Sequence, residues 1–239
     1  MSELIFTDAG VSPPPTPVFD SSITFSIDDS GGATAHDFRF RFTATDINVK
    51  IIWGDGTSEV LYSANGGSNY LFSKNFQCPG VIAVQWGGGE LTQLNIPSNN
   101  ITEIHETDLS LLTYLKCDDN KLTSLDCAGA VELITLICND NLLTSINIAD
   151  SPLLDGLFTY NNQLEDTDIS NNPATSDYVL SNNIFTVTAV SNALITLDNN
   201  GLLNGNFDSK NQTPAAPPNP AGVTAANNLI GKVWSIVSD

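Results

Sequence analysis

A repeat of 21 residues, which runs from about residue 91 to residue 210, constrains the fold of this chain more than any other feature. Its copies carry apolar residues at the same offsets, and the leading column consists of Leu91, Leu112, Leu133 and Leu154. A single copy cannot bury its apolar edge, whereas stacked copies form a continuous core with parallel strands on at least one wall. The sequence therefore predicts a solenoid of about six rungs, in which residues 195–202 form a shorter last rung.

An asparagine recurs at one position of each copy and is predicted to form a structural ladder. The column consists of Asn99, Asn120, Asn141, Asn162 and Asn183. An inward amide at each turn can pair with backbone groups that a buried corner would leave without partners. Calcium binding by the neighbouring Asp118, Asp119 and Asp140 stays an open alternative, although these acids fit no calcium-loop motif. We assign the asparagines a structural role and predict no metal site.

The consensus of the repeat resembles the nested leucine-rich repeats of bacteria, which also have 21 residues. Leu-x-x-Leu-x-(Cys/Leu)-x-x-Asn-x-Leu-x-x-Leu-x-Leu describes most copies, so that both halves of a rung carry a similar leucine-rich unit. The resemblance implies a leucine-rich-repeat solenoid, in agreement with the periodicity.

Residues 20–90 are predicted to form a small β-sandwich, which makes the chain mainly β. The segment Phe38-Arg39-Phe40-Arg41-Phe42 alternates strictly, as a strand with one buried face requires. Other apolar runs are separated by clusters of Gly, Asp, Asn and Ser, and they span residues 23–27, 49–53, 60–62 and 81–86. Short strands with turn signals at this spacing are typical of a sandwich.

Two turns in this part resemble those of PKD-type, immunoglobulin-like domains of bacterial and phage surface proteins. One is the segment Trp53-Gly54-Asp55-Gly56-Thr57, and the other is Pro79-Gly80 before a Val-rich last strand. Lys74-Asn75-Phe76 stands where that family usually has His-x-Tyr. Together with the repeat, the resemblance implies a surface-displayed protein that binds carbohydrates or other proteins.

Proline-rich stretches at residues 11–17 and 214–220 mark two extended segments. We expect residues 1–19 to be an anchoring arm and residues 211–239 to be a linker followed by a C-terminal cap that covers the last rung.

Within this cap, residues 224–230 are predicted to form a helix with Thr224 as its N-cap, and residues 233–237 a strand. The tail resembles the closing segment of virion-associated leucine-rich-repeat proteins of phages that infect Bacteroidetes-type hosts.

The composition excludes several functions. The chain has 8 basic and 27 acidic residues, a net charge of −19, and 41% hydrophobic residues, which is too apolar for a disordered acidic tail. Nucleic-acid binding needs clustered Lys and Arg, and a membrane span needs a long apolar run; the sequence contains neither. The N-terminus has no secretory signal pattern, so we expect synthesis in a cytoplasm without standard secretion.

The sequence predicts no enzyme and no cofactor. His36 and His105 fall in different segments, and no Ser or Cys lies in a nucleophile motif. The four cysteines have no zinc-site spacing, and they are Cys78, Cys117, Cys127 and Cys138. Cys117 and Cys138 fall in one inward column, where we expect buried free thiols.

The outward faces of the rungs provide the candidate binding site. The central outward column is Asn95, Lys116, Ile137, Phe158, Val179 and Thr196, with Tyr114 and Tyr160 beside it. The second-half wall is polar and acidic instead, with Ser124, Asp126, Ser145, Asn147, Asp166 and Asp168. An apolar band of this kind marks an interaction surface. The candidate site therefore comprises Tyr114, Lys116, Ile137, Phe158, Tyr160 and Val179. Three alternatives stay open for what covers it: a foreign ligand, another part of the same chain, or a sister subunit.

These observations predict a non-enzymatic structural and binding protein on a phage virion surface, such as a spike, penton or fibre component. It would be made in the host cytoplasm and mediate host attachment. Its expected partners are other virion proteins or sister subunits in a homo-oligomer, and a host surface protein or glycan. The alternatives are a bacterial surface or secreted leucine-rich-repeat adhesin, and an accessory binding module of a glycan-acting enzyme.

Overall fold

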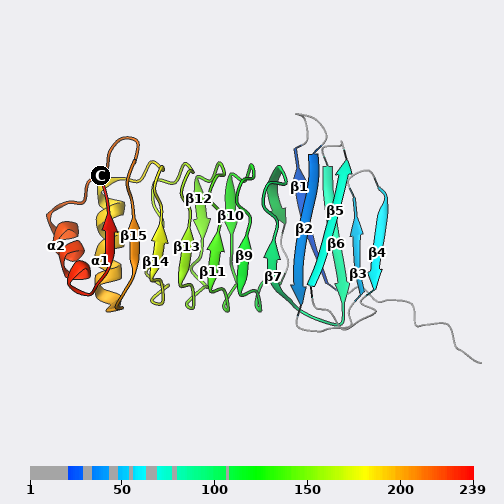
Figure 1. The fold of residues 1–239 in the computed structure, drawn as a ribbon, viewed down its shortest axis with the longest axis horizontal. Coiled ribbons are helices and arrows are strands. Elements are labelled where there is room, and N and C mark those ends of the chain that lie inside the picture. The colour runs from blue at the N-terminus through cyan, green and yellow to red at the C-terminus, as the bar shows by residue number, and fades with distance from the viewer. Residues whose placement is uncertain are drawn as a thin grey trace, which may run out of the picture.

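The described part of the chain forms an elongated, mainly β molecule with two helices at one end (Figure 1). The computed structural model describes residues 21–28, 34–42, 48–53, 56–62, 69–76, 80–105 and 108–239. The predicted arm over residues 1–19 and Cys78 lie outside these residues. The predicted fold class, a small β-sandwich followed by a solenoid with a C-terminal cap, is confirmed.

The first six strands form the sandwich, and they are β1 (Ser21–Ile27), β2 (Thr34–Phe42), β3 (Asn48–Ile52), β4 (Ser58–Tyr62), β5 (Asn69–Phe76) and β6 (Gly80–Gly87). The strands of one layer follow the order β4-β3-β6-β1, and the other layer contains β2 and β5. In β2, Phe38, Phe40 and Phe42 are buried while Arg39 and Arg41 are exposed. The phenylalanine rings fill the space between the layers, where Phe42 contacts Trp86 with ring centroids 5.4 Å apart.

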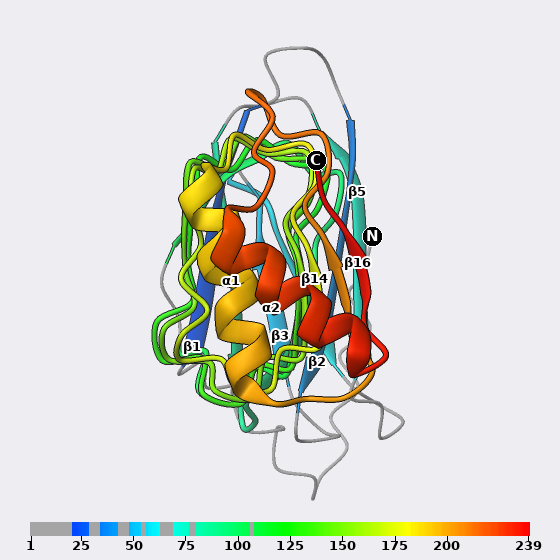
Figure 2. The ribbon, with the colours of Figure 1, turned by 90° about the vertical axis from the view of Figure 1, so that its left-hand side faces the viewer.

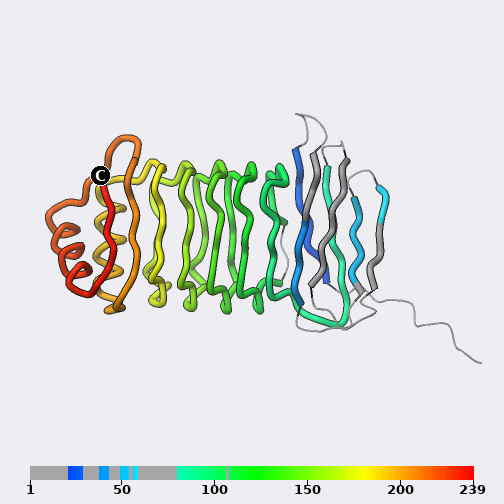
Figure 3. Tube along the Cα trace, viewed as in Figure 1, coloured from blue at the N-terminus to red at the C-terminus, as the bar shows by residue number. Residues whose placement is uncertain are grey.

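The repeats form the middle of the molecule, where successive rungs stack side by side (Figure 3). The strands of the first wall are β7 (Leu91–Asn95), β9 (Tyr114–Lys116), β11 (Thr135–Ile137), β13 (Gly156–Phe158) and β14 (Asp177–Val179). They pair in parallel at a register of one repeat, so that Leu94, Leu115, Leu136 and Leu157 stand side by side in the core. The second wall has β8 (Ile101–His105), β10 (Ser124–Asp126) and β12 (Ser145–Asn147).

The first rung of the solenoid adds one strand to each sheet of the sandwich. Strand β7 pairs antiparallel with β2, which places Leu94 opposite Phe40. Strand β8 pairs antiparallel with β1, which places Ile104 opposite Phe25. A single sheet of nine strands therefore runs along the whole molecule in the order β16-β15-β14-β13-β11-β9-β7-β2-β5. The sandwich thus covers the first rung and protects its strand edges.

The prediction of a sixth rung over residues 195–202 is wrong, because these residues belong to helix α1 (Val187–Asn200) and the turn after it. Thr186 caps the helix, since its hydroxyl accepts a hydrogen bond from the backbone N of Ala189 at 3.1 Å. Val190, Leu194 and Leu197 are buried, and their spacing follows the helical period rather than that of a strand. Asp208, in strand β15 (Asn206–Asp208), pairs with Val179 at the sheet position that the sequence predicted for Thr196.

The C-terminal segment closes the solenoid with helix α2 (Pro220–Gly231) and strand β16 (Ser235–Val237). Figure 2 shows α1 and α2 lying across the end of the stacked rungs. The N-cap of α2 is Asn219 and not the predicted Thr224, because the Asn219 side chain accepts from the backbone N of Ala221 and Gly222 at 3.0 Å. Proline at position 220 starts the helix earlier than the apolar pattern suggests.

Lys232 fixes the two helices to each other. Its Nζ lies 2.6 Å from Asp198 Oδ1 and also donates to the Asp198 carbonyl oxygen at 2.7 Å. Asn228 donates to the second oxygen of the same carboxylate at 2.8 Å. These bonds hold the end of α1 against α2.

Candidate binding face

Two rows of outward side chains cross the outer face of the nine-stranded sheet. The upper row follows the register through Arg39, Asn95, Lys116, Ile137, Phe158, Val179 and Asp208. The lower row follows it through Arg41, Gln93, Tyr114, Thr135, Gly156, Asp177 and Asn206. The residue between the two rows in each strand points into the core, so backbone pleating alone fixes these rows on the surface.

The structure brings together the six residues that the sequence proposed for binding. Lys116, Ile137, Phe158 and Val179 are neighbours in the upper row, and Tyr114 is in the lower row. Tyr160 lies two residues beyond Phe158, after the end of β13. All six side chains are half-buried rather than fully exposed.

Gly156 shapes the middle of the face. A Cβ atom at this position would lie 3.1 Å from Cε2 of Phe158, so the phenyl ring rests over the glycine. The ring therefore occupies space that a side chain at position 156 would fill. A fixed aromatic group loses little conformational entropy when it contacts a ligand.

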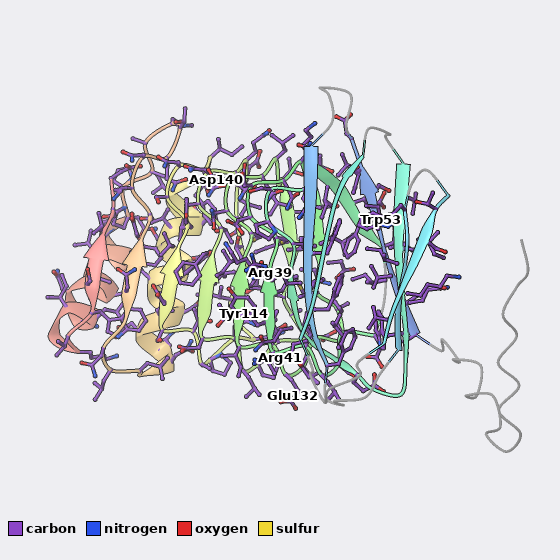
Figure 4. The ribbon with its side chains drawn as sticks, turned by 45° about the vertical axis from the view of Figure 1, so that its right-hand side comes forward. Arg39, Arg41, Trp53, Tyr114, Glu132 and Asp140 are labelled. Carbon is purple, nitrogen blue, oxygen red and sulfur yellow. The ribbon has the colours of Figure 1, made fainter. Side chains whose placement is uncertain are left out.

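Four polar residues adjoin this site at the sandwich end, and the sequence had placed only Asn95 in the outward column. Arg39 and Arg41 belong to β2, and Gln93 and Asn95 belong to β7. The alternation in 38–42 predicts that both arginines face outward, but only the pairing of β2 with β7 puts them beside the solenoid. Figure 4 shows Arg39, Arg41 and Tyr114 near one another where the sandwich meets the solenoid.

Charge changes sign along the face. Between β2 and β13 the two rows contain no Asp or Glu, whereas Asp177 and Asp208 occupy the far end. Asp177 accepts a hydrogen bond from Asn206 at 2.9 Å, and Asp208 lies 3.3 Å from the amine of Lys210. The face is therefore cationic at the sandwich, apolar in the middle and acidic toward the cap.

The asparagine column lies inside the solenoid and links successive rungs. Asn141 Oδ1 accepts from the backbone N of Leu122 at 3.0 Å, in the preceding rung. Its Nδ2 donates to the carbonyl oxygens of Cys117 at 3.0 Å and Cys138 at 3.2 Å. Asn120, Asn162 and Asn183 repeat this pattern, while Asn99 in the first rung donates to Pro97 within its own turn.

Gln212 completes the ladder, and the sequence did not reveal it. Its Oε1 accepts from the backbone N of Phe185 at 3.0 Å, and its Nε2 donates to the carbonyl oxygens of Leu180 and Ser209. The 21-residue spacing misses this position, because helix α1 lengthens the last rung.

The acids beside the ladder have partners within the chain. Asp118 lies 2.6 Å from the amine of Lys116, Ser98 donates to Asp119 at 2.7 Å, and Asn139 donates to Asp140 at 2.7 Å. Within the part of the chain that the structure describes, no three His, Cys, Asp or Glu side chains are grouped to hold a metal ion.

Three cysteines are buried free thiols in the core. Burial raises the pKa of Cys127 to about 12, with a smaller effect of Asp126. Burial also raises the pKa of Cys117 and of Cys138 well above the usual range. These thiols are therefore protonated at neutral pH and have little reactivity.

A serine–histidine pair lies on the other sheet, between β1 and β8. His105 Nε2 is 2.7 Å from Ser26 Oγ, and Glu103 Oε1 is 3.6 Å from His105 Nδ1. An acyl-transfer site also needs donors aimed at a developing oxyanion. Here β1 pairs with β6 on one side and with β8 on the other, so its backbone N–H groups form hydrogen bonds to neighbouring strands instead. The side chain of the other histidine, His36, lies outside the described residues.

A groove of about 400 Å³ lies where helix α1 meets the second wall. Asp166 and Asp168 line one side, and Asn192 and Thr196 of α1 line the other. Both carboxylates accept hydrogen bonds within their own turn, from the backbone N of Thr167 and of Ser170 at 2.8 Å. Hydrogen bonds from the backbone and the side chain of Ser170 lower the pKa of Asp168.

No described helix is both long and apolar enough to cross a membrane.

Comparison with known proteins yields a partial likeness among solved structures. No protein-family model and no curated protein matches the sequence. Among solved structures, the chain is similar to the functional domain of InlJ from Listeria monocytogenes, described as including a cysteine ladder. The two share 26% identity over 51% of this chain, with a TM-score of 0.38. This chain matches only 36% of the length of that protein's chain.

Proposed function

We propose that this chain is a non-enzymatic structural and binding protein of a phage virion surface, and that the outer face of its nine-stranded sheet mediates attachment to the host. The observation that carries the proposal is the row of half-buried apolar and aromatic side chains along that face. Ile137, Phe158 and Val179 stand on adjacent paired strands, with Tyr114 beside them.

The architecture suits display of such a face. The sandwich covers one end of the solenoid and the two helices cover the other, so stacking on further rungs is blocked at both ends. Backbone pairing fixes every position of the rows, and rigid aromatic anchors contribute most of the binding energy in many interfaces.

Two further features support a virion. The sequence of the tail resembles virion-associated leucine-rich-repeat proteins, and the described cysteines are free thiols that need no oxidising compartment. A bacterial surface adhesin would use the same face, so the location must be tested separately. Mass spectrometry of purified virions should detect the chain, whereas its recovery from bacterial membranes alone would overturn the virion assignment.

The face is tested with Phe158→Asp and Tyr160→Ser, each of which alters a half-buried side chain of the site. Ile230→Asp is the control, because Ile230 is exposed on α2 at the capped end. We expect both face variants to lose host-cell binding while the control retains it. Light scattering reports the oligomeric state in parallel. Loss of oligomers without loss of binding would show a sister-subunit interface, and an effect on neither property would overturn the proposal.

A further inference from the structure

Five side chains form a polar corner where the sandwich joins the solenoid. This arginine corner consists of Arg39, Arg41, Gln93, Asn95 and Tyr114. Adjacent strands are about 4.8 Å apart, and alternate residues of a strand are about 7 Å apart. The corner therefore covers roughly 10 by 7 Å, which is the size of one or two sugar rings.

The corner is a local exception in an acidic chain with a net charge of −19. Lys116, Lys121, Lys210 and Lys232 each lie within an ion pair, at 2.6, 3.0, 3.3 and 2.6 Å respectively. Arg39 is exposed and takes no part in these four ion pairs. Because the two rows have no acid before β14, the corner complements an anionic ligand.

We propose that the arginine corner binds a carboxylated saccharide, such as a uronic or sialic acid unit of a surface glycan. A guanidinium group matches a carboxylate with two parallel hydrogen bonds. The amides of Gln93 and Asn95 offer donors and acceptors for sugar hydroxyls. The ring of Tyr114 supplies an apolar surface for the C–H face of the sugar.

The short extent of positive charge on this face favours a ligand of this kind over longer polyanions. A nucleic acid requires cations along the length of its backbone. Here the cationic character ends within three strands, since Ile137 and Phe158 follow in the upper row and Asp208 ends it. The ligand therefore has an acidic group at one place and less polar surface beyond it.

This inference rests on the proposed use of the same face, and free saccharides test it without cells. The probes for isothermal titration are trimers of galacturonic acid and of sialic acid, and the galacturonate trimer with its carboxyl groups reduced. We expect at least one acidic trimer to bind and the reduced trimer not to bind. Arg39→Gln and Arg41→Gln should each weaken binding about tenfold or more.

Lys50→Gln is the matched control, because it makes the same change in net charge on β3 of the other sheet. This variant should bind as the parent protein does. Tyr114→Leu, at a half-buried position, should keep the fold and weaken binding about fivefold. Absence of binding by both acidic trimers, equal loss in Lys50→Gln, or equal affinity for a glutamate peptide would overturn the inference.

The two proposals fail in different ways. If Phe158→Asp abolishes host attachment but no trimer binds, the saccharide assignment is wrong and the binding face stands. If the trimers bind but Phe158→Asp leaves attachment intact, the corner stands and the wider face is not the attachment site.

Discussion

Gly205 lies against the indole ring of Trp234, and a Cβ atom on residue 205 would lie 2.5 Å from that ring. Trp234 is 4% exposed, and its Nε1 donates to the carbonyl oxygen of Leu202 at 3.0 Å. Burial and this hydrogen bond hold the ring against Gly205. This contact brings the last strand, β16, against β15 and closes the solenoid.

Gly205→Ala is expected to destabilise the protein, because the added methyl group overpacks a fixed ring. Overpacking of this kind costs about 1–3 kcal/mol. Gly231→Ala is the control, since a Cβ there meets no atom within 4 Å and alanine favours a helix. Urea unfolding measures both variants. Equal stability of the two variants would contradict a tight contact at Gly205.

Asn141→Ala is expected to lower the free energy of unfolding by about 1–3 kcal/mol, which is the cost of one buried group left without a partner. The change leaves the backbone N of Leu122 without its partner, whereas the carbonyl oxygens of Cys117 and Cys138 keep the amides of Asn120 and Asn162. Asn171→Ala, at an exposed position, should change stability by less than about 0.5 kcal/mol. Denaturant titration compares them, and similar values for both would contradict the ladder's role.

Stability should fall as the pH rises from about 9 toward 12. Thiols of the unfolded chain ionise at about pH 8.5, whereas burial keeps the folded thiols protonated and raises the pKa of Cys127 to about 12. The unfolded state thus loses protons first, and alkaline pH favours it. Chemical unfolding at a series of pH values measures the slope.

Cys127→Ala should make this slope shallower, because it removes one of the thiols whose pKa differs between the two states. An unchanged slope in the variant would assign the alkaline loss to other groups. At pH 8, a thiol reagent should label the described cysteines only after denaturant is added.

The sandwich and the solenoid should unfold together, because β7 joins them in one sheet. Gln93→Pro places a residue without an N–H group in the middle of β7, removes a hydrogen bond of the sheet and should lower the free energy of unfolding by about 1–3 kcal/mol. Gln93→Thr keeps the N–H group and is the control. Calorimetry should show one transition for the parent and the control, and a separated or earlier transition for the proline variant. Two transitions in the parent protein would contradict the coupling.

The repeat could be predicted from the sequence because one physical requirement acts at every copy. Leu94, Leu115 and Leu136 are inward for the same reason, and an error at one rung is corrected by the next. The 195–202 segment lacked this support, since its apolar residues fit two periods. The segment forms a helix because the hydroxyl of Thr186 caps its first turn and because Val190, Leu194 and Leu197 are buried at helical spacing.

The binding face could be predicted only in part. Tyr114, Ile137 and Phe158 follow from the repeat alone, because a strand alternates its sides. Arg39 and Arg41 are more than 50 residues away from Gln93 and Asn95, and no local pattern indicates which strand they meet. Gln212 likewise enters the ladder only because α1 turns the chain back into register.

By itself, the sequence determined the inward leucines, the asparagine column and the outward direction of each strand residue, since these depend on periods that neighbouring residues enforce. The tertiary structure alone decided that the sandwich and the solenoid form one nine-stranded sheet. Pairing between distant strands depends on which exposed edges can satisfy each other's backbone hydrogen bonds, and that choice is made between whole elements rather than within any of them.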